Sequence, residues 1–530
     1  MTRLCVLVLL LLATAIQPAS HPGIFASSAA LPTPRVVLAT ASAAKVVARP
    51  LIAVLPKAIA QAVRAGTNRQ DLAPYLNAAL RSGGAFDLGG FTYRIAGRLM
   101  PGAGTQLTGT GVFLADPAFD DHARADGLQM MIRLTDGLQV GKGVVFDGNS
   151  IDRPGFWLTG ARNTQGVADV VLDATFRNIS FDGIDVSRNN GTWRNRNIKT
   201  SATVENVGWI GVNLEGIDGL VHDGLHVSRT GFHGIYVSFS HDVRGDGFKV
   251  DKSRRPYRVY DGPGGFSGKE KGFLFGHFST SHARWTHFLL FDNRHAGYDG
   301  FGIGEDGPLG DAESTDIVAQ GEIWYAGLFG FDVSSNMTAD IKVYYPTRQG
   351  VQFGLDLGGT LSNINVKALV ESNREDESAR FSATGIAPRK ASMQAGSRVM
   401  TIVGGGNFTV VPGQVASGPG IPTGAKVVSI VGDQVTLSLP AQRTSPNGAP
   451  VDTAFRASIT FENCVLDLRA NNVRYGLGVQ SDADGFAHYS NVRVSGDLST
   501  AADASVRRLN GRLPSGMTIS AKLNPAHAGQ

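Results

Sequence analysis

A short glycine-centred phrase recurs along the chain and limits the folds that are open to it. Each copy has a bulky or polar pair, then Gly, then alternating apolar positions, and most copies lie about 20 to 30 residues apart. That spacing is typical of stacked-repeat solenoids. One copy is too short to bury its own apolar side chains, so successive copies must stack on one another. The copies are Phe181–Val186, Trp209–Leu214, Phe232–Val237, Tyr298–Ile303, Leu328–Val333, Gln349–Phe353 and Tyr475–Val479.

The segments between the copies favour a parallel β-helix. Further apolar strands such as Asp340–Val343 and Asn363–Val366 lie there, without intervening helices. Two or three short strands per repeat suit a β-helix, whereas a β-propeller blade needs about four strands and roughly 40 residues. We therefore predict an all-β fold, a right-handed parallel β-helix, over residues 57–389 and 457–500. Apolar residues at helical spacing over Lys57–Leu80 predict an N-terminal capping helix for the open end of the coil.

Three segments fall outside this pattern. In residues 390–456, strand-like runs are separated by Gly- and Pro-rich turns, which predicts a small inserted β-module. Residues 16–56 are rich in Ala, Pro, Ser and Val without periodicity and are interpreted as a linker. Residues 501–530 are interpreted as a frayed tail.

The first residues predict export. Arg3 precedes an apolar run over Leu4–Ala13, and Ala13–Ala15 offers small residues for cleavage, so 1–15 is interpreted as a signal peptide. An uncleaved anchor is the competing interpretation, but the run is short for a membrane span. No long apolar run follows, so no membrane span is expected after signal removal. The expected location is secreted, periplasmic or at the cell surface.

Charge and cysteine content exclude other classes. The formal charge of +4 on 530 residues is compatible with an anionic glycan but too weak to indicate nucleic acid. Cys464 is the only cysteine after the predicted signal, so no intrachain disulfide and no zinc site built on paired cysteines is expected. The oligomeric state is left open.

The position two residues after each glycine forms a candidate binding surface. Because side chains alternate along a strand, this position faces outward while its neighbours face the core. Carboxylates and amides there could bind sugar hydroxyls, and aromatic faces could cover a sugar ring. The alternative is that outward residues are simply polar. The column reads Asp185, Asn213, Tyr236, Gly302, Asp332 and Gln352.

The position just before the glycine adds candidate catalytic groups. Asp182 could lie within reach of Asp185, and a close carboxylate pair raises one pKa, as an acid catalyst requires. His233 could tune these groups or act as a base, and Asp299 holds the same position in a later copy. The alternative is that Asp and His before Gly brace a turn by bonding backbone N–H groups.

A charged, His-rich region lies in the middle of the chain. Eight of the 12 histidines fall between His222 and His295, but their spacing matches no compact metal-ligand motif. The basic segment Arg244–Lys271 is interpreted as a loop that walls a cleft, or alternatively as a solvated surface. Glu305 adds a carboxylate to Asp299 nearby.

These phrases resemble the pectin lyase-like superfamily over about residues 70–390 and 457–495. Phe181–Asp185 is similar to the Asp-Gly-Ile-Asp strand of polygalacturonases, whose Asp before Gly is catalytic, and Phe232–Ile235 is similar to their Gly-His-Gly strand. The resemblance implies catalytic roles for Asp182 and His233. The strand between them departs from that family, because Trp209–Asn213 lacks its Asp pair, and the family's Arg-Ile-Lys is missing after the His.

The leading hypothesis is an exported polysaccharide-degrading enzyme, a glycoside hydrolase or a polysaccharide lyase acting on a glycan that could be acidic. For elimination, Tyr236 or Arg294 would serve as the base. The alternative is a non-catalytic, glycan-binding surface or adhesion protein. No cofactor is expected; calcium would be compatible with elimination, although no dedicated calcium loop is present. The candidate catalytic residues are Asp182, Asp185, His233, Asp299 and Glu305, and the candidate substrate-binding residues are Arg188, Trp209, Asn213, Tyr236, Arg294, His295 and Asp332.

Overall fold

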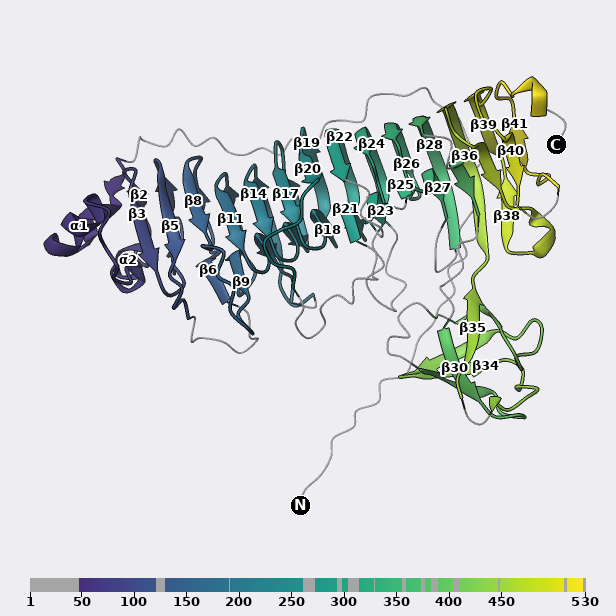
Figure 1. The fold of residues 1–530 in the computed structure, drawn as a ribbon, viewed down its shortest axis with the longest axis horizontal. Helices are drawn as coiled ribbons and strands as arrows, with labels where there is room; N and C mark the ends of the chain where they lie inside the picture. The colour runs from purple at the N-terminus through teal and green to yellow at the C-terminus, as the bar shows by residue number, and fades with distance from the viewer. Residues whose placement is uncertain are drawn as a thin grey trace, which may run out of the picture. The chain divides into compact units, whose positions relative to one another are not determined.

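Strands from successive coils pair in parallel and build two long sheets (Figure 1). The computed structural model describes residues 47–120, 129–189, 191–260, 272–292, 298–303, 314–327, 329–354, 359–372, 377–382, 389–403, 410, 412–446, 449–509 and 512–527. All of them belong to one unit, Ala43–Gln530. The predicted signal peptide 1–15 lies outside the described residues.

The first sheet, here called the repeat sheet, contains every copy of the glycine phrase. Consecutive strands are in register, with Ile184 opposite Val212, which in turn lies opposite Ile235. This parallel stacking confirms the predicted β-helix. Among the described residues, its strands are β6 (Gln129–Arg133), β9 (Leu158–Arg162), β12 (Ile184–Val186), β15 (Val212–Glu215), β18 (Ile235–Ser238), β21 (Gly272–Phe278), β23 (Tyr298–Ile303), β25 (Phe329–Asp332), β27 (Gln349–Phe353), β29 (Glu377–Phe381), β37 (Tyr475–Val479) and β40 (Ala504–Arg508).

The second sheet, here called the long sheet, carries the other strands of each coil. Its described strands are β1 (Arg49–Pro50), β2 (Ala85–Asp87), β3 (Thr92–Ile95), β4 (Gln106–Thr108), β5 (Gly111–Ala115), β7 (Gln139–Val140), β8 (Val144–Asp147), β10 (Val171–Leu172), β11 (Thr175–Ile179), β13 (Asn195–Thr200), β14 (Thr203–Val207), β16 (Ile217–Val221), β17 (His226–Thr230), β19 (His241–Asp246), β20 (Lys249–Lys252), β22 (Ser281–Asp292), β24 (Thr315–Trp324), β26 (Met337–Tyr344), β28 (Gly359–Glu371), β36 (Ile459–Asn471), β38 (Ala487–Ser490), β39 (Val492–Asp497) and β41 (Met517–Ile519).

At Gly183 and Gly211 the spacing between coils leaves no room for a Cβ. A Cβ on Gly211 would lie 2.5 Å from the carbonyl oxygen of Gly234 in the next coil and 2.3 Å from a methyl group of Val227. A Cβ on Gly183 would meet the carbonyl oxygen of Gly211 at the same distance of 2.5 Å. Four strands of the repeat sheet escaped the sequence analysis because another residue replaces the glycine. These residues are Met131 in β6, Leu274 in β21, Ser378 in β29 and Ser505 in β40.

Inward-facing side chains form one continuous core along the coil. Phe275, Phe301 and Phe331 come from consecutive repeat-sheet strands, and their rings stack with centroids 5.0 and 4.8 Å apart. His222 and His277 lie fully buried in the same interior, where Trp285 donates its indole N–H to His222 at 3.0 Å. Two of the clustered histidines are therefore core residues rather than exposed ligands.

The N-terminal cap differs from the prediction of one helix over Lys57–Leu80. Two helices are present, α1 (Lys57–Arg64) and α2 (Ala73–Leu80). Helix α1 ends because Gly66 adopts a φ of 70°, and the N–H of Thr67 then bonds the carbonyl of Ala62 at 2.9 Å. Both helices contribute buried side chains to the first part of the core, and Figure 1 places them at its first coils.

Three predicted boundaries also need correction. The end of the predicted linker 16–56 belongs to the coil, because β1 pairs with β2 and the 3₁₀ helix η1 (Leu51–Val54) buries Leu51. The predicted loop Arg244–Lys271 begins with strands of the long sheet as far as Lys252. The predicted frayed tail 501–530 contains β40, which pairs with β37, and β41, which pairs with β39. It also contains the 3₁₀ turn η4 (Pro525–His527), while the 3₁₀ turn η3 (Asp482–Asp484) lies before it.

The predicted inserted module has its own antiparallel sheet and its own core. The chain returns to the coil after it, because β28 pairs directly with β36 across the insertion. The Val427 N–H bonds the Gln414 carbonyl and the Gly413 N–H bonds the Val427 carbonyl, each at 2.8 Å, so the two ends of the sheet meet beside Val415 and Lys426. Its described strands are β30 (Arg389–Met393), β31 (Val399–Val403), β32 (Val415–Ser417), β33 (Val427–Val431), β34 (Gln434–Leu437) and β35 (Val451–Arg456).

Gly211→Ala is expected to lower the free energy of unfolding by roughly 1–3 kcal/mol, because the coils cannot separate locally to admit a methyl group. Urea unfolding followed by circular dichroism measures the change. Gly97→Ala is the matched control, since its Cβ would meet nothing closer than 3.9 Å and its φ is not positive. Equal stability of the two variants would contradict the spacing argument.

Acid should destabilise the fold through the buried histidines. Burial lowers the pKa of both His222 and His277 to about 3, so only the unfolded chain takes up these protons as the pH falls from 6.5. Stability is thus fully present above pH 6.5 and is lost toward pH 3, by up to about 5 kcal/mol per histidine. Urea unfolding at several pH values should show a shallower loss for His222→Gln, whereas His488→Gln, at an exposed position, should match the parent chain.

Candidate active site

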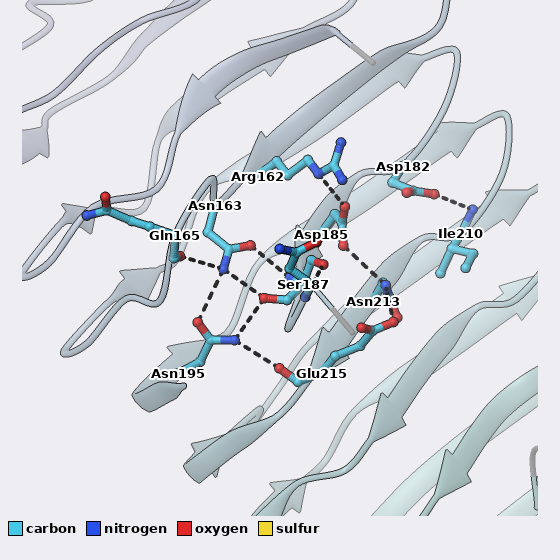
Figure 2. Close-up of polar contacts among 11 residues, drawn as sticks. Arg162, Asn163, Gln165, Asp182, Asp185, Ser187, Asn195, Ile210, Asn213 and Glu215 are labelled. Carbon is cyan, nitrogen blue, oxygen red and sulfur yellow. Dashed lines mark hydrogen bonds and ion pairs between the residues drawn. The ribbon is translucent and has the colours of Figure 1, made fainter. Parts of the chain in front are cut away.

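A polar network occupies the outward column of β9, β12 and β15 (Figure 2). The Arg162 guanidinium lies 2.9 Å from the Asp185 carboxylate, and the Asn213 amide donates to the same carboxylate at 3.1 Å. The Asn213 amide nitrogen also donates to Glu215 at 3.1 Å, so one side chain bridges two acids. The oxygen of the Asn213 amide is buried and makes no hydrogen bond among the described residues. The network therefore gives the Asp185 carboxylate two donors, a guanidinium and an amide.

Asp182 lies in a different environment although it belongs to the same coil. It is 4 % exposed, and its carboxylate accepts the backbone N–H of Ile210 at 3.0 Å. Burial raises the pKa of Asp182 well above its usual range, and the charge of Asp185 raises it further, against the opposing effects of the Ile210 N–H and Arg162. One coil thus presents a carboxyl group whose pKa is raised beside a carboxylate that is ion-paired with an arginine.

The position before the glycine also has a structural use. Asp182 bonds the N–H of Ile210, and Asp299 bonds that of Phe329 at 3.1 Å in the same way. His233 accepts the N–H of Phe273 at 3.0 Å through Nδ1. Each polar side chain therefore satisfies a backbone donor of the following coil, as the turn-bracing alternative predicted.

This bond decides the chemistry of His233. Because Nδ1 accepts a backbone proton, the neutral ring carries its own proton on Nε2. Burial and the nearby Lys252 lower the pKa of His233 well below its usual range, so the ring stays neutral. His233 can donate a hydrogen bond from Nε2, but it has no free nitrogen lone pair with which to act as a base.

A row of aromatic side chains lies beside these acids. Phe181 and Trp209 stack with ring planes 8° apart, and Trp209 lies 4.5 Å from the Phe232 ring. Tyr260, from the described part of the segment after β20, packs edge-on against Phe181 at 4.7 Å and Trp209 at 5.2 Å. The backbone N–H of Tyr260 bonds the carbonyl of Gly208 at 2.9 Å, which ties this segment to the coil.

Some predicted site residues lie apart from the acid pair. Asp299 is four strands from Asp182 and Asp332 five from Asp185, which at the usual strand spacing corresponds to about 19 and 24 Å. Glycosidase carboxyl pairs stand roughly 5 to 9.5 Å apart, so neither Asp299 nor Asp332 can complete a pair with the acids of this coil. Arg188 stacks on the Phe239 ring at 3.1 Å. Tyr236 adjoins the site, with its ring 5.0 Å from His233. Glu305, Arg294 and His295 lie outside the described residues.

Two members of the network escaped the sequence analysis. Arg162 stands two residues after Gly160 and lies in register with Asp185, so Thr159–Arg162 is a further copy of the phrase. Glu215 occupies the next outward position after Asn213 and could have been found by continuing the alternation. A second polar group, also unforeseen, lies in the later coils, where Glu377 pairs with Arg380 at 2.5 Å and Arg507 at 3.0 Å.

Within the described ranges, no group of three His, Cys, Asp or Glu side chains could hold a metal ion. Likewise, no described helix combines the length and apolar character needed to cross a membrane.

Comparison with known proteins gives structural likenesses only. No family model and no curated protein matches the chain. The chain is similar to the A-module of a mannuronan C-5 epimerase from Azotobacter vinelandii, with 13 % identity, a TM-score of 0.39, and coverage of 86 % of this chain and 95 % of that one. It is also similar to the catalytic domain of a GH87 α-1,3-glucanase in complex with nigerose, with 10 % identity, a TM-score of 0.33, and coverage of 85 % and 66 %. The tailspike of E. coli bacteriophage HK620 in complex with a pentasaccharide shows 9 % identity, a TM-score of 0.31, and coverage of 73 % and 90 %. Because these TM-scores are low, the assignment of the β-helix fold depends on the strand registers of this chain alone.

Asp182→Asn should make the fold more stable at neutral pH. The folded pKa of Asp182 is raised, so the folded chain holds this proton more tightly than the unfolded chain, and stability falls as the pH rises through the folded pKa. Asn at position 182 keeps an acceptor for the Ile210 N–H and cannot ionise, so the variant does not lose stability as the pH rises. Urea unfolding should show an advantage for the variant that grows as the pH rises above about 4.

Asp185→Asn provides the contrast, because it leaves the Arg162 guanidinium without its carboxylate and should cost about 3 kcal/mol. If Asp182→Asn tracked the parent chain at every pH, the assignment of a raised pKa to Asp182 would be wrong.

Proposed function

We propose that the protein is exported and cleaves a polysaccharide at the Asp182–Asp185 coil, as a glycoside hydrolase or a polysaccharide lyase. The observation that supports this is the opposite electrostatic environment of the two carboxyl groups. Burial raises the pKa of Asp182 well above its usual range, whereas Asp185 is ion-paired with Arg162 and accepts a hydrogen bond from Asn213. Acid–base catalysis on a glycosidic bond needs one group of each kind.

In hydrolysis the two groups would divide the work. Asp182 would donate its proton to the departing glycosidic oxygen, and the Asp185 carboxylate would either attack the anomeric carbon or deprotonate the attacking water. Asn213 would contribute the free oxygen of its amide as an acceptor for a sugar hydroxyl. Trp209 and Phe232 would border the bound sugar on the side of the aromatic row.

In β-elimination the roles change. Tyr236 would remove the proton beside a uronate carboxylate, and Arg162 would offset the charge that develops. His233 would contribute a hydrogen bond from Nε2, since Nδ1 is occupied by the Phe273 N–H. Calcium would serve the same neutralising purpose if the substrate supplied further ligands.

A second candidate is a non-catalytic protein that binds glycans through the same column. The supporting observation is that Asp182, His233 and Asp299 each satisfy a backbone N–H of the following coil. A purely structural use would explain their low exposure of 4 %, 7 % and 2 %. The two candidates differ in whether Asp182 matters beyond its hydrogen bond.

Asp182→Asn should abolish cleavage and retain binding. The mature protein is incubated with a panel of neutral and anionic polysaccharides, while new reducing ends and the ultraviolet absorbance of unsaturated uronates are followed together. Reducing ends without absorbance indicate hydrolysis, and both together indicate elimination. Loss of a general acid or base typically lowers the rate by about 10²–10⁴.

Asp299→Asn is the matched control, because Asp299 makes the same bond to the following coil at 3.1 Å but lies four strands away. Cleavage lost in Asp182→Asn and kept in Asp299→Asn supports catalysis at Asp182. Glycan binding without cleavage of any polymer, in parent and variants alike, would support the non-catalytic candidate.

A further inference from the structure

An aromatic cluster lies on the outer face of the long sheet, away from the repeat sheet. Phe291, Trp324 and Tyr344 lie at the C-terminal ends of β22, β24 and β26, where Phe291 precedes the last residue of its strand, and the strand registers place them side by side. Figure 1 shows these three strands as neighbours in the coil. Tyr325 and Tyr345 follow at the adjoining corner. Apart from Phe291, these side chains are tyrosine or tryptophan, and all five are half-buried rather than enclosed.

The cluster departs from the rest of this face. The preceding outward positions of the same strands hold charge pairs, such as Glu322 with Lys342 at 2.9 Å and Asp340 with Lys367 at 3.4 Å. These paired charges are what a solvated sheet surface normally carries. At the last outward position the pattern changes to aromatic, and the rings associate closely, with Trp324 and Tyr344 centroids 4.0 Å apart.

The backbone at the corner gives an independent reason to look for a ligand. Tyr325 and Tyr345 have φ values of 59° and 55°, a left-handed conformation that bulky residues rarely adopt. In the same corner column, the left-handed residues of other described coils are Asn178, Asn206, Arg229 and Asn472. Asn suits this conformation and tyrosine is strained in it. Strain retained at a surface position is a mark of function rather than of folding.

We propose that the cluster of Phe291, Trp324, Tyr325, Tyr344 and Tyr345 is a binding platform for a neutral polysaccharide, separate from the acid pair. Two ring pairs run along the coil, Trp324 on Tyr344 and Tyr325 on Tyr345, the latter with centroids 5.3 Å apart. They offer apolar surface together with phenol and indole hydrogen-bonding groups, which suits the amphipathic surface of a sugar chain.

The polar rim specifies the class of glycan. The Tyr345 hydroxyl donates to Glu371 at 3.2 Å, and Glu322 and Lys342 neutralise each other. The rim thus has an excess of negative charge and would repel uronates. The remaining carboxylate oxygen of Glu371 can accept a sugar hydroxyl. The platform would hold a polymer on the coil while the chemistry takes place on the other sheet, so it shares a ligand class with the proposed function but does not depend on Asp182.

The test replaces the strained tyrosines by the residue that this corner normally carries. Tyr325→Asn/Tyr345→Asn removes two rings and relieves the backbone, so the variant should melt at the same or a higher temperature than the parent chain. Retention is measured by co-sedimentation with insoluble cellulose, chitin, β-1,3-glucan and α-1,3-glucan, and with calcium gels of polygalacturonate as the anionic arm. The parent chain should sediment with at least one neutral polymer, and the variant should lose about tenfold in its bound-to-free ratio.

Controls keep the platform distinct from the acid pair. Tyr75→Asn removes an exposed tyrosine from helix α2 and should sediment like the parent chain. Sedimentation does not require cleavage, so a failure of the proposed catalysis leaves this result readable. The proposal is overturned if the parent binds none of the neutral polymers, if it binds only polygalacturonate, or if the double Asn variant sediments unchanged.

Discussion

The close approach of each repeat glycine to the next coil is the contact on which the rest of the structure depends. The carbonyl oxygen of Gly234 lies where a Cβ of Gly211 would be, and Val227 fills the inner side. This close contact prevents β12, β15 and β18 from shifting along one another, and these strands stack in a single register. A one-residue shift would exchange the core and outer faces, so register and side-chain orientation are set together.

Register turns sequence positions into columns of side chains. In the column before the glycine, Asp182 is followed in the next coil by Ile210, and His233 by Phe273. Asp182 and His233 therefore each accept the backbone N–H of a residue with an apolar side chain. The column after the glycine brings Arg162, Asp185 and Asn213 into one network. Burial between stacked coils then raises the pKa of Asp182, three residues from the ion-paired Asp185. The same stacking that stabilises the fold therefore gives these two carboxyl groups different surroundings.

Stacking also places the corners of successive coils in columns, and these columns differ in the residue types that occupy their left-handed backbone positions. Asn336, Asn363, Asn463 and Asn491 form a ladder of amide hydrogen bonds on left-handed backbone. Tyrosine takes the place of asparagine at another corner only in Tyr325 and Tyr345 among the described coils. A coil can thus present two different surfaces, an acid pair on the repeat sheet and aromatic rings on the long sheet, without disturbing the shared core.

The β-helix, the cap and the inserted module could be predicted from the residues alone. Glycine spacing and alternation are patterns within short segments, and each coil shows the same patterns again. The sequence also identified Asp182, Asp185, Asn213 and Tyr236, which follow from counting along one strand. It missed β6, β21, β29 and β40, where Met131, Leu274, Ser378 and Ser505 replace the marker glycine. It could not show that Asp299 lies four strands from Asp182, because similar phrases carry no record of how many coils separate them. The folded structure was needed to find the partners of each acid, the tautomer of His233 and the strain at Tyr325. Each of these depends on atoms about 20 to 30 residues or more away in the chain, which stacking brings within a few ångströms.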